Sequence, residues 1–489
     1  MSMKEFSLEA ISTTGGDHIE NSDKVSKADN DGEDEEYTVK EQRKIIHKID
    51  RRLLVILGAM QAVSFLDRAN MSNANIAGMA KALHLAVGKR YSVVLLVFFG
   101  PYILLQIPSN RLLRKIGPRV FMSSTVVAWG IVMMCFGFVQ SWRSLIPLRL
   151  LLGALESGAL SGQFYLISCW YARYDLHKRV STFYLIAVLG SAFGGVLGLL
   201  FSQMGGLGGE AAWRWIFIME GLLTIIIGVL GYAFMINFPE ESHKAWGFLS
   251  VKEKDFVIRH INRDRADAET PNFSWKRLFS AALDWKIWSF GLLFFCSTIQ
   301  AYSVGFYLPL ILEGEMGFSV AAAQALSSPP YLAAMALMFV EGYICDKVRL
   351  RGPCLVFNAL LSATGLCMMT WTTSSGSQYV GSLFVTAGCS ANIPAVMVYQ
   401  ANNIRGHWKR AFCNASLSSL GGIGGIAGSL VFRSEDAPDY VPGITACLVA
   451  NGLTLLLVGL MTIFFYVRNH QAARGDFILE NLPGFRYTY

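Results

Sequence analysis

Residues 443–467 read GITACLVANGLTLLLVGLMTIFFYV, a run of twenty-five positions without a charged side chain. A helix must contain roughly 20 mostly apolar residues to cross the hydrocarbon core of a membrane. Because the run meets that length and contains no proline, we expect it to form a membrane-spanning helix. The number of such runs along the chain then indicates the fold class.

Eleven other apolar runs precede this one. They lie at 53–74, 91–109, 121–140, 145–167, 180–203, 213–236, 287–311, 321–343, 354–372, 379–399 and 411–432. The polar segment 238–286 separates the first six runs from the last six. The sequence therefore predicts an all-α integral membrane protein with 12 transmembrane helices in two six-helix bundles, a plan that places a binding site between the two halves.

The composition excludes an ordinary soluble protein. Hydrophobic residues make up 53% of the 489 positions and charged residues only 16%, whereas soluble domains contain about 25% charged residues. The net charge is +7, but the Lys and Arg residues lie in the segments between the apolar runs. Binding to nucleic acid would require a basic stripe on one folded face, so we expect no nucleic-acid partner.

The placement of Lys and Arg predicts the orientation in the membrane. If the N-terminus is cytoplasmic, the loops 110–120, 172–179, 238–286, 344–353 and 404–410 are also cytoplasmic. These loops contain about 22 Lys and Arg residues, against about 6 in the outer loops, as the positive-inside rule requires. We therefore expect both termini to be cytoplasmic, in a multi-pass protein of the plasma membrane.

The same pattern divides the chain into five parts. Residues 1–50 form a disordered acidic tail and a basic surface stretch, 51–237 a six-helix bundle, and 238–286 a cytoplasmic central loop. Residues 287–467 form the second bundle, and 468–489 a cytoplasmic tail. The first part contains too few apolar residues to fold by itself.

The nine cysteines and eight histidines follow no metal-binding spacing. Cysteines such as Cys135, Cys169, Cys367 and Cys447 lie within apolar segments, so we expect the cysteines to be small buried apolar residues. A catalytic nucleophile motif is also missing from the sequence. We expect no cofactor, no metal and no enzymatic activity.

Two ionisable residues stand near the end of the first apolar run, in the sequence Phe65-Leu-Asp-Arg-Ala-Asn70. Charged side chains inside a membrane are costly, so Asp67 and Arg68 are candidate functional residues. The alternative is that both lie at a solvated helix end. Ten mostly small or polar residues follow Asn70 before Lys81, which favours the functional interpretation.

The fourth apolar run contains a second charged pair, Arg149 and Glu156. A separation of seven residues places both side chains on one face of a helix, two turns apart. Desolvation disfavours the charged form of a buried carboxyl group, and a proton-coupling group needs that property. A structural ion pair is the alternative role for Glu156, and Arg149 could instead anchor the outer helix end.

Polar and aromatic side chains in other runs could line the predicted binding site between the two halves. They are Tyr102, Gln106, Gln300, Tyr302 and Tyr399. Each one taken alone could equally serve packing or hydrogen bonding between helices. Glu220 is also intramembrane, and a structural pair with Arg214, about two turns away, is as plausible as a functional role.

From about Lys48 to Tyr489, the chain resembles the major facilitator superfamily. Within it, the chain is similar to the anion:cation symporter branch, especially to fungal allantoate and nicotinate permease-like members. The similar segments are 66–70, 106–110, 149–158, 213–221, 402–410 and 436–440. Gly342, Asp346 and Lys347 match the superfamily's loop signature, whereas the equivalent loop of the first half has Arg114 where an acidic residue is usual.

The resemblance implies a role for each matching position. It implies that Arg68 contacts a substrate carboxylate, that Arg149 is essential for the transport cycle and that Tyr102 lines the site. It implies that Asp67 and Glu156 take part in proton coupling. The predicted helix at 180–203 is nearly all apolar over 186–193, where sugar-acid carriers have a glutamine, so we expect a less polar ligand.

The sequence and the resemblance together predict a secondary active transporter. We expect a monomer in the lipid bilayer that moves a small organic anion together with a proton by alternating access. One alternative is a transporter that exports a secondary metabolite of a fungal gene cluster. An alternative from another class is a nutrient-sensing transceptor.

Overall fold

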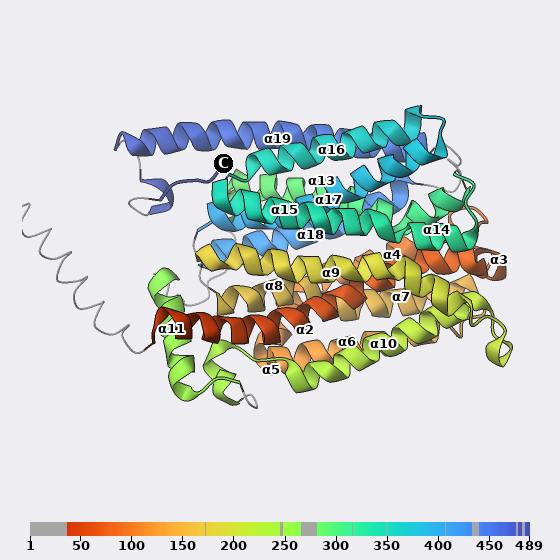
Figure 1. Cartoon of the computed structure of the whole chain (residues 1–489), viewed down its shortest axis with the longest axis horizontal. Coiled ribbons are helices and arrows are strands. Elements are labelled where there is room, and N and C mark those ends of the chain that lie inside the picture. The colour runs from red at the N-terminus through yellow and green to blue at the C-terminus, as the bar shows by residue number, and fades with distance from the viewer. Residues whose placement is uncertain are drawn as a thin grey trace, which may run out of the picture. The chain divides into compact units, whose positions relative to one another are not determined.

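The computed structural model describes residues 37–171, 173–244, 248–265, 281–314, 316–348, 350–405, 407–432, 440–475, 478–481 and 485–489. All regular elements in these residues are helices (Figure 1). The tail 1–36, the loop residues 266–280 and the predicted motif positions 436–439 lie outside the described residues. The chain divides at Arg52 into two units, and the described part of the first unit is 37–51.

The first unit contains the start of the long helix α2 (Val39–Ala74). Thr38 precedes this helix, and the Glu41 carboxylate accepts hydrogen bonds from both the Thr38 amide and the Thr38 hydroxyl, each at 2.8 Å. A threonine followed three residues later by glutamate is a common helix start, because it satisfies an amide that would otherwise lack a partner. This local pairing explains why α2 begins here.

The first half of the chain is a succession of helices with short connections. After α2 come η2 (Asn75–Met79), α3 (Ala80–Ala82), α4 (Arg90–Leu104), α5 (Gln106–Ile116), α6 (Pro118–Phe136), α7 (Trp142–Glu156), α8 (Ala159–Trp170), α9 (Arg173–Ser202), η3 (Leu207–Gly209) and α10 (Ala212–Phe234). Each of the first six predicted apolar runs lies mostly within these helices, and the runs 121–140, 180–203 and 213–236 extend past a helix end by one to four residues. The second run is bent by 58° between α4 and α5, close to Pro101, which cannot donate a helical hydrogen bond.

The polar segment and the second half are also helical where they are described. Their elements are η4 (Pro239–Lys244), α11 (Val251–Arg265), η5 (Ala281–Leu283), α13 (Trp285–Gly314), α14 (Val320–Leu326), α15 (Ser328–Val348), α16 (Gly352–Trp371), α17 (Ser375–Asn403), α18 (His407–Val431), α19 (Val441–Ala473) and η7 (Leu479–Asn481). The segment predicted as a central loop thus contains the helix α11. The last predicted run lies in α19, which continues to Ala473.

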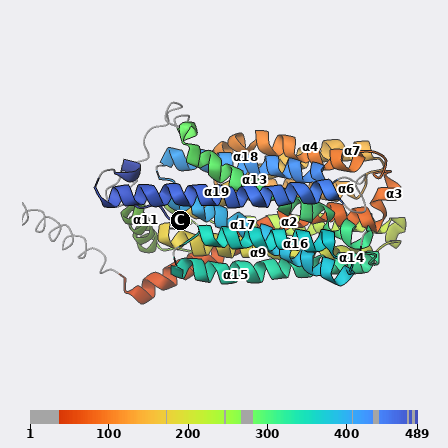
Figure 2. The ribbon, with the colours of Figure 1, turned by 90° about the horizontal axis from the view of Figure 1, so that it is seen from above.

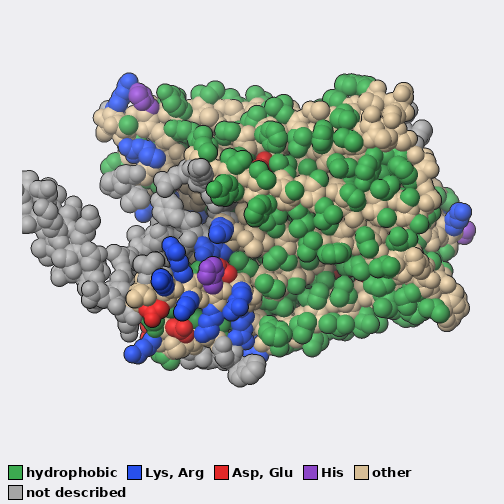
Figure 3. All heavy atoms as spheres, viewed as in Figure 1, with side chains coloured by type: hydrophobic (Ala, Val, Ile, Leu, Met, Phe, Trp, Pro, Cys, Tyr) green, Lys and Arg blue, Asp and Glu red, His purple; other side chains and the backbone are tan. Residues whose placement is uncertain are grey.

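The lengths and the apolar surfaces of these helices are those of a membrane protein. Among the described residues, nine helices are long and apolar enough to cross a membrane, or ten when the bent pair of α4 and α5 counts as one span. The two other predicted runs lie in α2 and α18. Figure 3 shows hydrophobic side chains over most of one face and Lys and Arg side chains gathered around α11. This is the all-α membrane fold that the sequence predicts.

Small residues allow several helices to pack closely, as is usual in membranes. Helix α6 packs along α10, and α16 packs along α17. At the second contact, a Cβ atom on Gly365 would lie 2.5 Å from the carbonyl oxygen of Gly381, and a Cβ atom on Gly381 would lie 2.7 Å from that of Gly365. Neither position can accept a larger residue without separating the two backbones.

The two halves meet mainly through the helices α9 and α4 of the first half. Helix α9 of the first half packs against α14 and α15, and α4 packs against α18. Figures 1 and 2 both show α9 beside α15. This arrangement leaves a central region between the halves, where side chains from both can meet.

The expectation that the cysteines are small buried apolar residues is wrong for two of them. Cys345, near the end of α15, and Cys354, near the start of α16, form a disulfide. Only three positions, 349–351, separate the two helices in the sequence, so Cys345 and Cys354 are just nine positions apart. The free cysteines Cys296, Cys389, Cys413 and Cys447 are buried, as expected. The expectation is also wrong for Cys135, which is exposed, and Cys169 and Cys367 are only partly buried.

Candidate functional site

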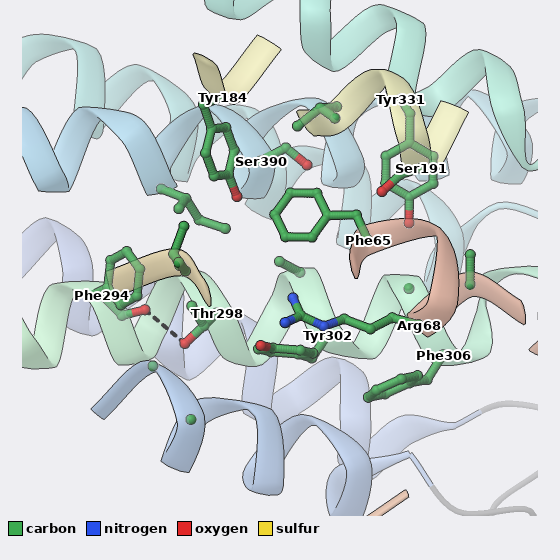
Figure 4. A pocket seen from close by; sticks show the side chains of 18 of the residues that line it. Phe65, Arg68, Tyr184, Ser191, Phe294, Thr298, Tyr302, Phe306, Tyr331 and Ser390 are labelled. Carbon is green, nitrogen blue, oxygen red and sulfur yellow. Dashed lines mark hydrogen bonds between the residues drawn. The ribbon is translucent and has the colours of Figure 1, made fainter. Parts of the chain in front are cut away.

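A cavity of about 90 Å³ lies between the two halves (Figure 4). Helices α2, α4, α8 and α9 line it from the first half, and α13, α15, α17 and α18 from the second. Its walls are mainly aromatic: Phe65, Tyr102, Tyr184, Phe294, Tyr302, Phe306 and Tyr331. Thr298, Ser191, Ser390 and Ser418 add hydroxyl groups. Such a mixture of apolar walls and a few polar groups is typical of a small-molecule site.

Arg68 is the charged side chain among the cavity-lining residues that the structure describes. Its guanidinium carbon lies 5.0 Å from the centre of the Tyr302 ring and 5.2 Å from the centre of the Phe65 ring. Figure 4 shows the guanidinium between these two residues. Aromatic faces attract a cation, and they do so more strongly where water is excluded. The two rings therefore hold a positive charge in the wall of an otherwise apolar cavity.

Glu156, at the end of α7, lies next to Arg68. Its Oε2 atom is 3.7 Å from Nη2 of Arg68 and accepts a 2.9 Å hydrogen bond from the hydroxyl of Ser64. The Glu156 side chain is 1% exposed and that of Arg68 is 14% exposed. The ion pair matters because an isolated buried charge is very costly. The structure thus brings together two of the predicted charged residues, one at the cavity and one behind it.

Asp67 and Arg149 are not among the residues that line the cavity, although Arg149 is predicted to attract the anion together with Arg68. Both carboxylate oxygens of Asp67 are buried without a hydrogen-bond partner among the described residues, although Asp67 interacts electrostatically with Glu156, Arg149 and Arg68. Arg149 is 4% exposed, and its guanidinium lies 5.4 Å from the centre of the Phe136 ring. These residues extend the charged cluster into the first half of the protein.

Three other predicted residues lie at the cavity or next to it. Tyr102 and Tyr302 line it. Gln106 does not, but its Nε2 atom donates a 2.7 Å hydrogen bond to the hydroxyl of Ser418, which does line it. Because Gln106 belongs to α5 and Ser418 to α18, this hydrogen bond connects the two halves directly beside the cavity.

Gln300 and Tyr399 lie elsewhere, contrary to their predicted place at the cavity. Gln300 donates to Asn451 at 3.0 Å and accepts from Ser362 at 2.6 Å, in a buried network that connects α13, α16 and α19. Gln300 and Tyr302 are two positions apart, which is about 200° around a helix, so only one of them can face the cavity. The ring of Tyr399 packs on Phe290, with ring centres 5.2 Å apart.

The loop motif is described only in part. Gly342 lies in α15 and lines a small crevice together with Ser181 and Glu341. The side chains of Asp346 and Lys347 lie outside the described residues. The role of this loop in the conformational cycle stays a prediction.

Sequence reasoning missed several cavity residues, above all Phe65, Tyr184 and Tyr331. The chain contains 32 Phe and 18 Tyr residues, and aromatic residues inside apolar runs are common. The one signal that could have found Phe65 is its position three residues before Arg68, which places both on one face of α2. For Tyr184 and Tyr331 the sequence offers no comparable signal.

The comparison with known proteins gives the family. Residues 57–429 match the model of the Major Facilitator Superfamily. The chain belongs to this superfamily. It is therefore a multi-pass membrane transporter of the secondary type and not an enzyme, as the sequence predicts.

Curated relatives and solved structures agree with this assignment. The "MFS-type transporter cnsO" of Penicillium expansum is 29% identical over 89% of this chain and 85% of the relative. The "High-affinity nicotinic acid transporter" of Saccharomyces cerevisiae is 26% identical over 88% of this chain and 79% of the relative. The inward-facing structure of a bacterial homologue of the human lysosomal transporter Spinster has a similar fold, with a TM-score of 0.59, 14% identity, and coverage of 85% of this chain and 95% of that one.

Proposed function

We propose that this transporter belongs to the anion:cation symporter branch and carries a small organic anion together with a proton. The observation that carries the proposal is the ion pair between Arg68, in the cavity wall, and Glu156, which lies behind it. A guanidinium binds a carboxylate by strong charge-assisted hydrogen bonds. The neighbouring carboxyl group can compete for the same guanidinium when it is ionised and releases it when it is protonated.

This competition provides a coupling mechanism. With the cavity empty, ionised Glu156 balances the charge of Arg68. A proton on Glu156 removes that balance, and an anionic substrate then takes its place beside Arg68. The loaded protein carries no additional net charge in its buried centre, so the two halves can rock around the site at low cost.

The lining of the cavity favours a particular type of anion. Its rings, Phe65, Tyr184 and Tyr302 among them, offer apolar faces, and its volume is about 90 Å³. Flat rings stack well on aromatic side chains. We therefore propose a small planar monocarboxylate, which agrees with the prediction of a ligand less polar than a sugar acid. The similarity to a nicotinic acid transporter supports the same class of ligand.

Uptake of labelled aromatic monocarboxylates by cells expressing the protein tests this proposal. We expect uptake that rises with external acidity, and we expect Glu156→Gln to reduce proton-driven uptake at least tenfold. Glu210→Gln is the matched control, because Glu210 pairs with Arg214 at 3.0 Å, away from the cavity. Uptake by Glu156→Gln that keeps the full pH dependence would contradict the role of this pair.

The same assay separates the alternatives. Loading cells with the carboxylate and following its loss would detect export. The geometry of the site is equally compatible with uptake and with export. A protein that binds the carboxylate but moves none in either direction would be a sensor. Localisation of the tagged protein tests the proposed plasma membrane, and its mass in detergent tests the proposed monomer.

A further inference from the structure

A disulfide joins two helices at the side of the molecule that is predicted to be cytoplasmic. Cys345 of α15 and Cys354 of α16 form this bond, and they stand at the two ends of the loop 344–353, which the placement of Lys and Arg predicts to be cytoplasmic. The cytoplasm keeps thiols reduced, so a disulfide there is usually a redox sensor or a transient bond. The proposed transport mechanism does not use it.

The two helices that the disulfide joins have little other contact in the described structure. Helix α15 packs along α9 of the first half and α17 of the second, whereas α16 packs along α17 and α19 (Figures 1 and 2). Between the described side chains of α15 and α16, one hydrogen bond runs from Nδ2 of Asn358 to Oε2 of Glu341, at 3.0 Å. The disulfide is therefore a main tie between the end of α15 and the helix that follows it.

The disulfide lies in the wall of the small crevice that contains Gly342. Ser181 of α9 lines this crevice from the first half, and both cysteines line it from the second. Cys345 is 5% exposed, whereas Cys354 is only half-buried. Because a thiol must reach a sulfur atom to exchange with a disulfide, Cys354 is the sulfur that a small thiol attacks first.

The two sides of the disulfide are held differently. On the α16 side, the amide of Arg351 donates a 3.0 Å hydrogen bond to the carbonyl oxygen of Tyr489, in the final segment of the chain. On the other side, α15 contacts α9 of the opposite half, and contacts between the halves must change as the halves rock around the site. Opening of the disulfide therefore lets the end of α15 adjust to α9 without moving α16.

We propose that Cys345 and Cys354 are a redox-active pair, a site of thiol–disulfide exchange that controls how freely α15 moves and thereby the rate of transport. The thiolate of a small cytoplasmic thiol such as glutathione attacks Sγ of Cys354, the sulfur–sulfur bond breaks, and Cys345 leaves as a thiolate that takes up a proton. A second thiolate attacks the mixed disulfide and releases Cys354, which is protonated in turn. Two electrons thus pass to the protein, and two molecules of the small thiol become one disulfide.

The oxidised pair slows the cycle, because it ties α15 to a helix that does not contact the first half in the same way. The reduced pair lets α15 follow α9 and speeds the cycle. The transport rate therefore depends on the redox state of the cytoplasm, whichever substrate the protein carries.

The chemistry of the pair can be tested in sealed membrane vesicles of both orientations. Reduced glutathione is charged and does not cross a lipid bilayer. After alkylation of free thiols, we expect mass spectrometry of the wild-type protein to find Cys345 and Cys354 as thiols when millimolar glutathione reaches the cytoplasmic face, and as a disulfide again after oxidation with diamide. A bond that resists glutathione on both faces, that opens only from the outer face or that never forms with diamide would overturn the proposal.

The effect on transport can be measured in liposomes with labelled nicotinate as the probe carboxylate. We expect the oxidised wild type to take up the probe about fivefold more slowly than the reduced wild type, or more slowly still, as coupled sites commonly produce. Cys345→Ser and Cys354→Ser should keep the rate of the reduced protein under both conditions. Cys135→Ser is the matched control, because Cys135 is a free and exposed cysteine of α6, and this variant should keep the redox response of the wild type.

The outcomes distinguish the redox-active pair from the proposed function. If the wild type takes up the probe at one rate in both redox states, although alkylation shows that the bond opens and closes, control of transport by this pair is refuted and the proposed function stands. If the wild type transports no carboxylate in either state, the proposed function fails, and the alkylation result alone decides whether the two cysteines exchange with cytoplasmic thiols. Both comparisons use the wild-type protein, so neither depends on the folding of a variant.

Discussion

At the scale of single residues, the account depends on the guanidinium of Arg68 between the rings of Phe65 and Tyr302. A guanidinium is flat and offers a fork of donors, whereas an ammonium is a compact charge that lacks this shape. Its position also explains how a charge can be kept at an apolar wall: the rings attract it from two sides, and Glu156 balances it from a third.

Replacement of Arg68 should therefore weaken binding even when the charge is kept. We expect Arg68→Lys to raise the Kd for a carboxylate about tenfold to a hundredfold, because a charge-assisted hydrogen bond contributes about 1.5–3 kcal/mol. Tyr302→Phe is the matched control, since it keeps the ring face and removes only the hydroxyl. Calorimetry on the purified protein would measure both, and an unchanged Kd for Arg68→Lys would contradict the assignment.

At this scale the sequence predicts which residues matter better than where they point. The rarity of charges inside apolar runs identifies Asp67, Arg68, Arg149 and Glu156, and all four lie in one cluster. The rarity of charges does not show which of the two neighbours faces the cavity. Asp67 and Arg68 point in directions about 100° apart around the helix, and the structure shows that Arg68 is the one at the cavity. That choice depends on the neighbouring helices, which a single sequence does not reveal.

At the scale of helices and segments, the last residues of the chain are held against the second half. Asn403 of α17 binds both the amide and the carbonyl group of Thr488, at 2.8 and 3.0 Å. Asn469 of α19 binds Tyr487 in the same way. Glu480 accepts hydrogen bonds from Lys286 of α13 and, at 2.9 Å, from Lys409 of α18. The segment predicted only as a tail thus connects four helices.

Glu480 should contribute to stability in a pH-dependent way. Burial raises the pKa of its carboxyl group, but the hydrogen bonds and charges of Lys286 and Lys409 outweigh this effect and hold the pKa below its ordinary value of 4.5. A lowered pKa means that the stabilisation is fully present above pH 4.5 and is lost as the pH falls through the value in the folded protein.

We therefore expect Glu480→Gln to lower the Tm of the purified protein at pH 7, since loss of a buried partner costs on the order of 3 kcal/mol. The difference from the wild type should shrink below pH 4. Glu313→Gln, at the other end of α13, is the control. A difference in Tm that grows with acidity would mean that the Lys286 and Lys409 contacts do not stabilise this segment.

The sequence predicts the helices well because the membrane imposes one length and one composition on every span. Most of each of the twelve apolar runs lies within helices of the structure, and several runs extend past a helix end by one to four residues. The bend between α4 and α5 and the docked final segment were not predicted. Pro101 lies close to the bend but does not by itself fix its angle, and the docked segment depends on contacts between distant parts of the chain, such as Asn403 with Thr488.

At the scale of the whole molecule, contacts between the halves close the side predicted to be extracellular. Asn73 of α2 donates to the carbonyl oxygen of Gly194 and accepts at its own carbonyl oxygen from Gln324 of α14, at 3.1 and 3.2 Å. The backbone of α9 comes so close to α14 that a Cβ atom on Gly195 would lie 2.0 Å from the Gln324 carbonyl oxygen. Alternating access requires this contact to form and break in each cycle.

A methyl group at Gly195 should prevent this closure. We expect Gly195→Ala to lower the uptake rate at least tenfold without a comparable loss of protein from the membrane. Gly194→Ala is the matched control, because its Cβ atom would meet only the side chains of Ala69 and Leu66 of the same half, at 3.2 and 3.4 Å. Equal uptake rates for the two variants would show that the contact between α9 and α14 is not part of the cycle.

The measurement that tests the central claim most directly is proton movement caused by the substrate. Liposomes containing the purified protein and a pH-sensitive dye would receive an aromatic monocarboxylate from outside, with no gradient imposed beforehand. We predict acidification of the interior by the wild type, none by Arg68→Lys or Glu156→Gln at the same substrate concentration, and none with the matching neutral amide. Carboxylate entry by the wild type without any proton entry, or equal acidification by the three proteins, would contradict the account.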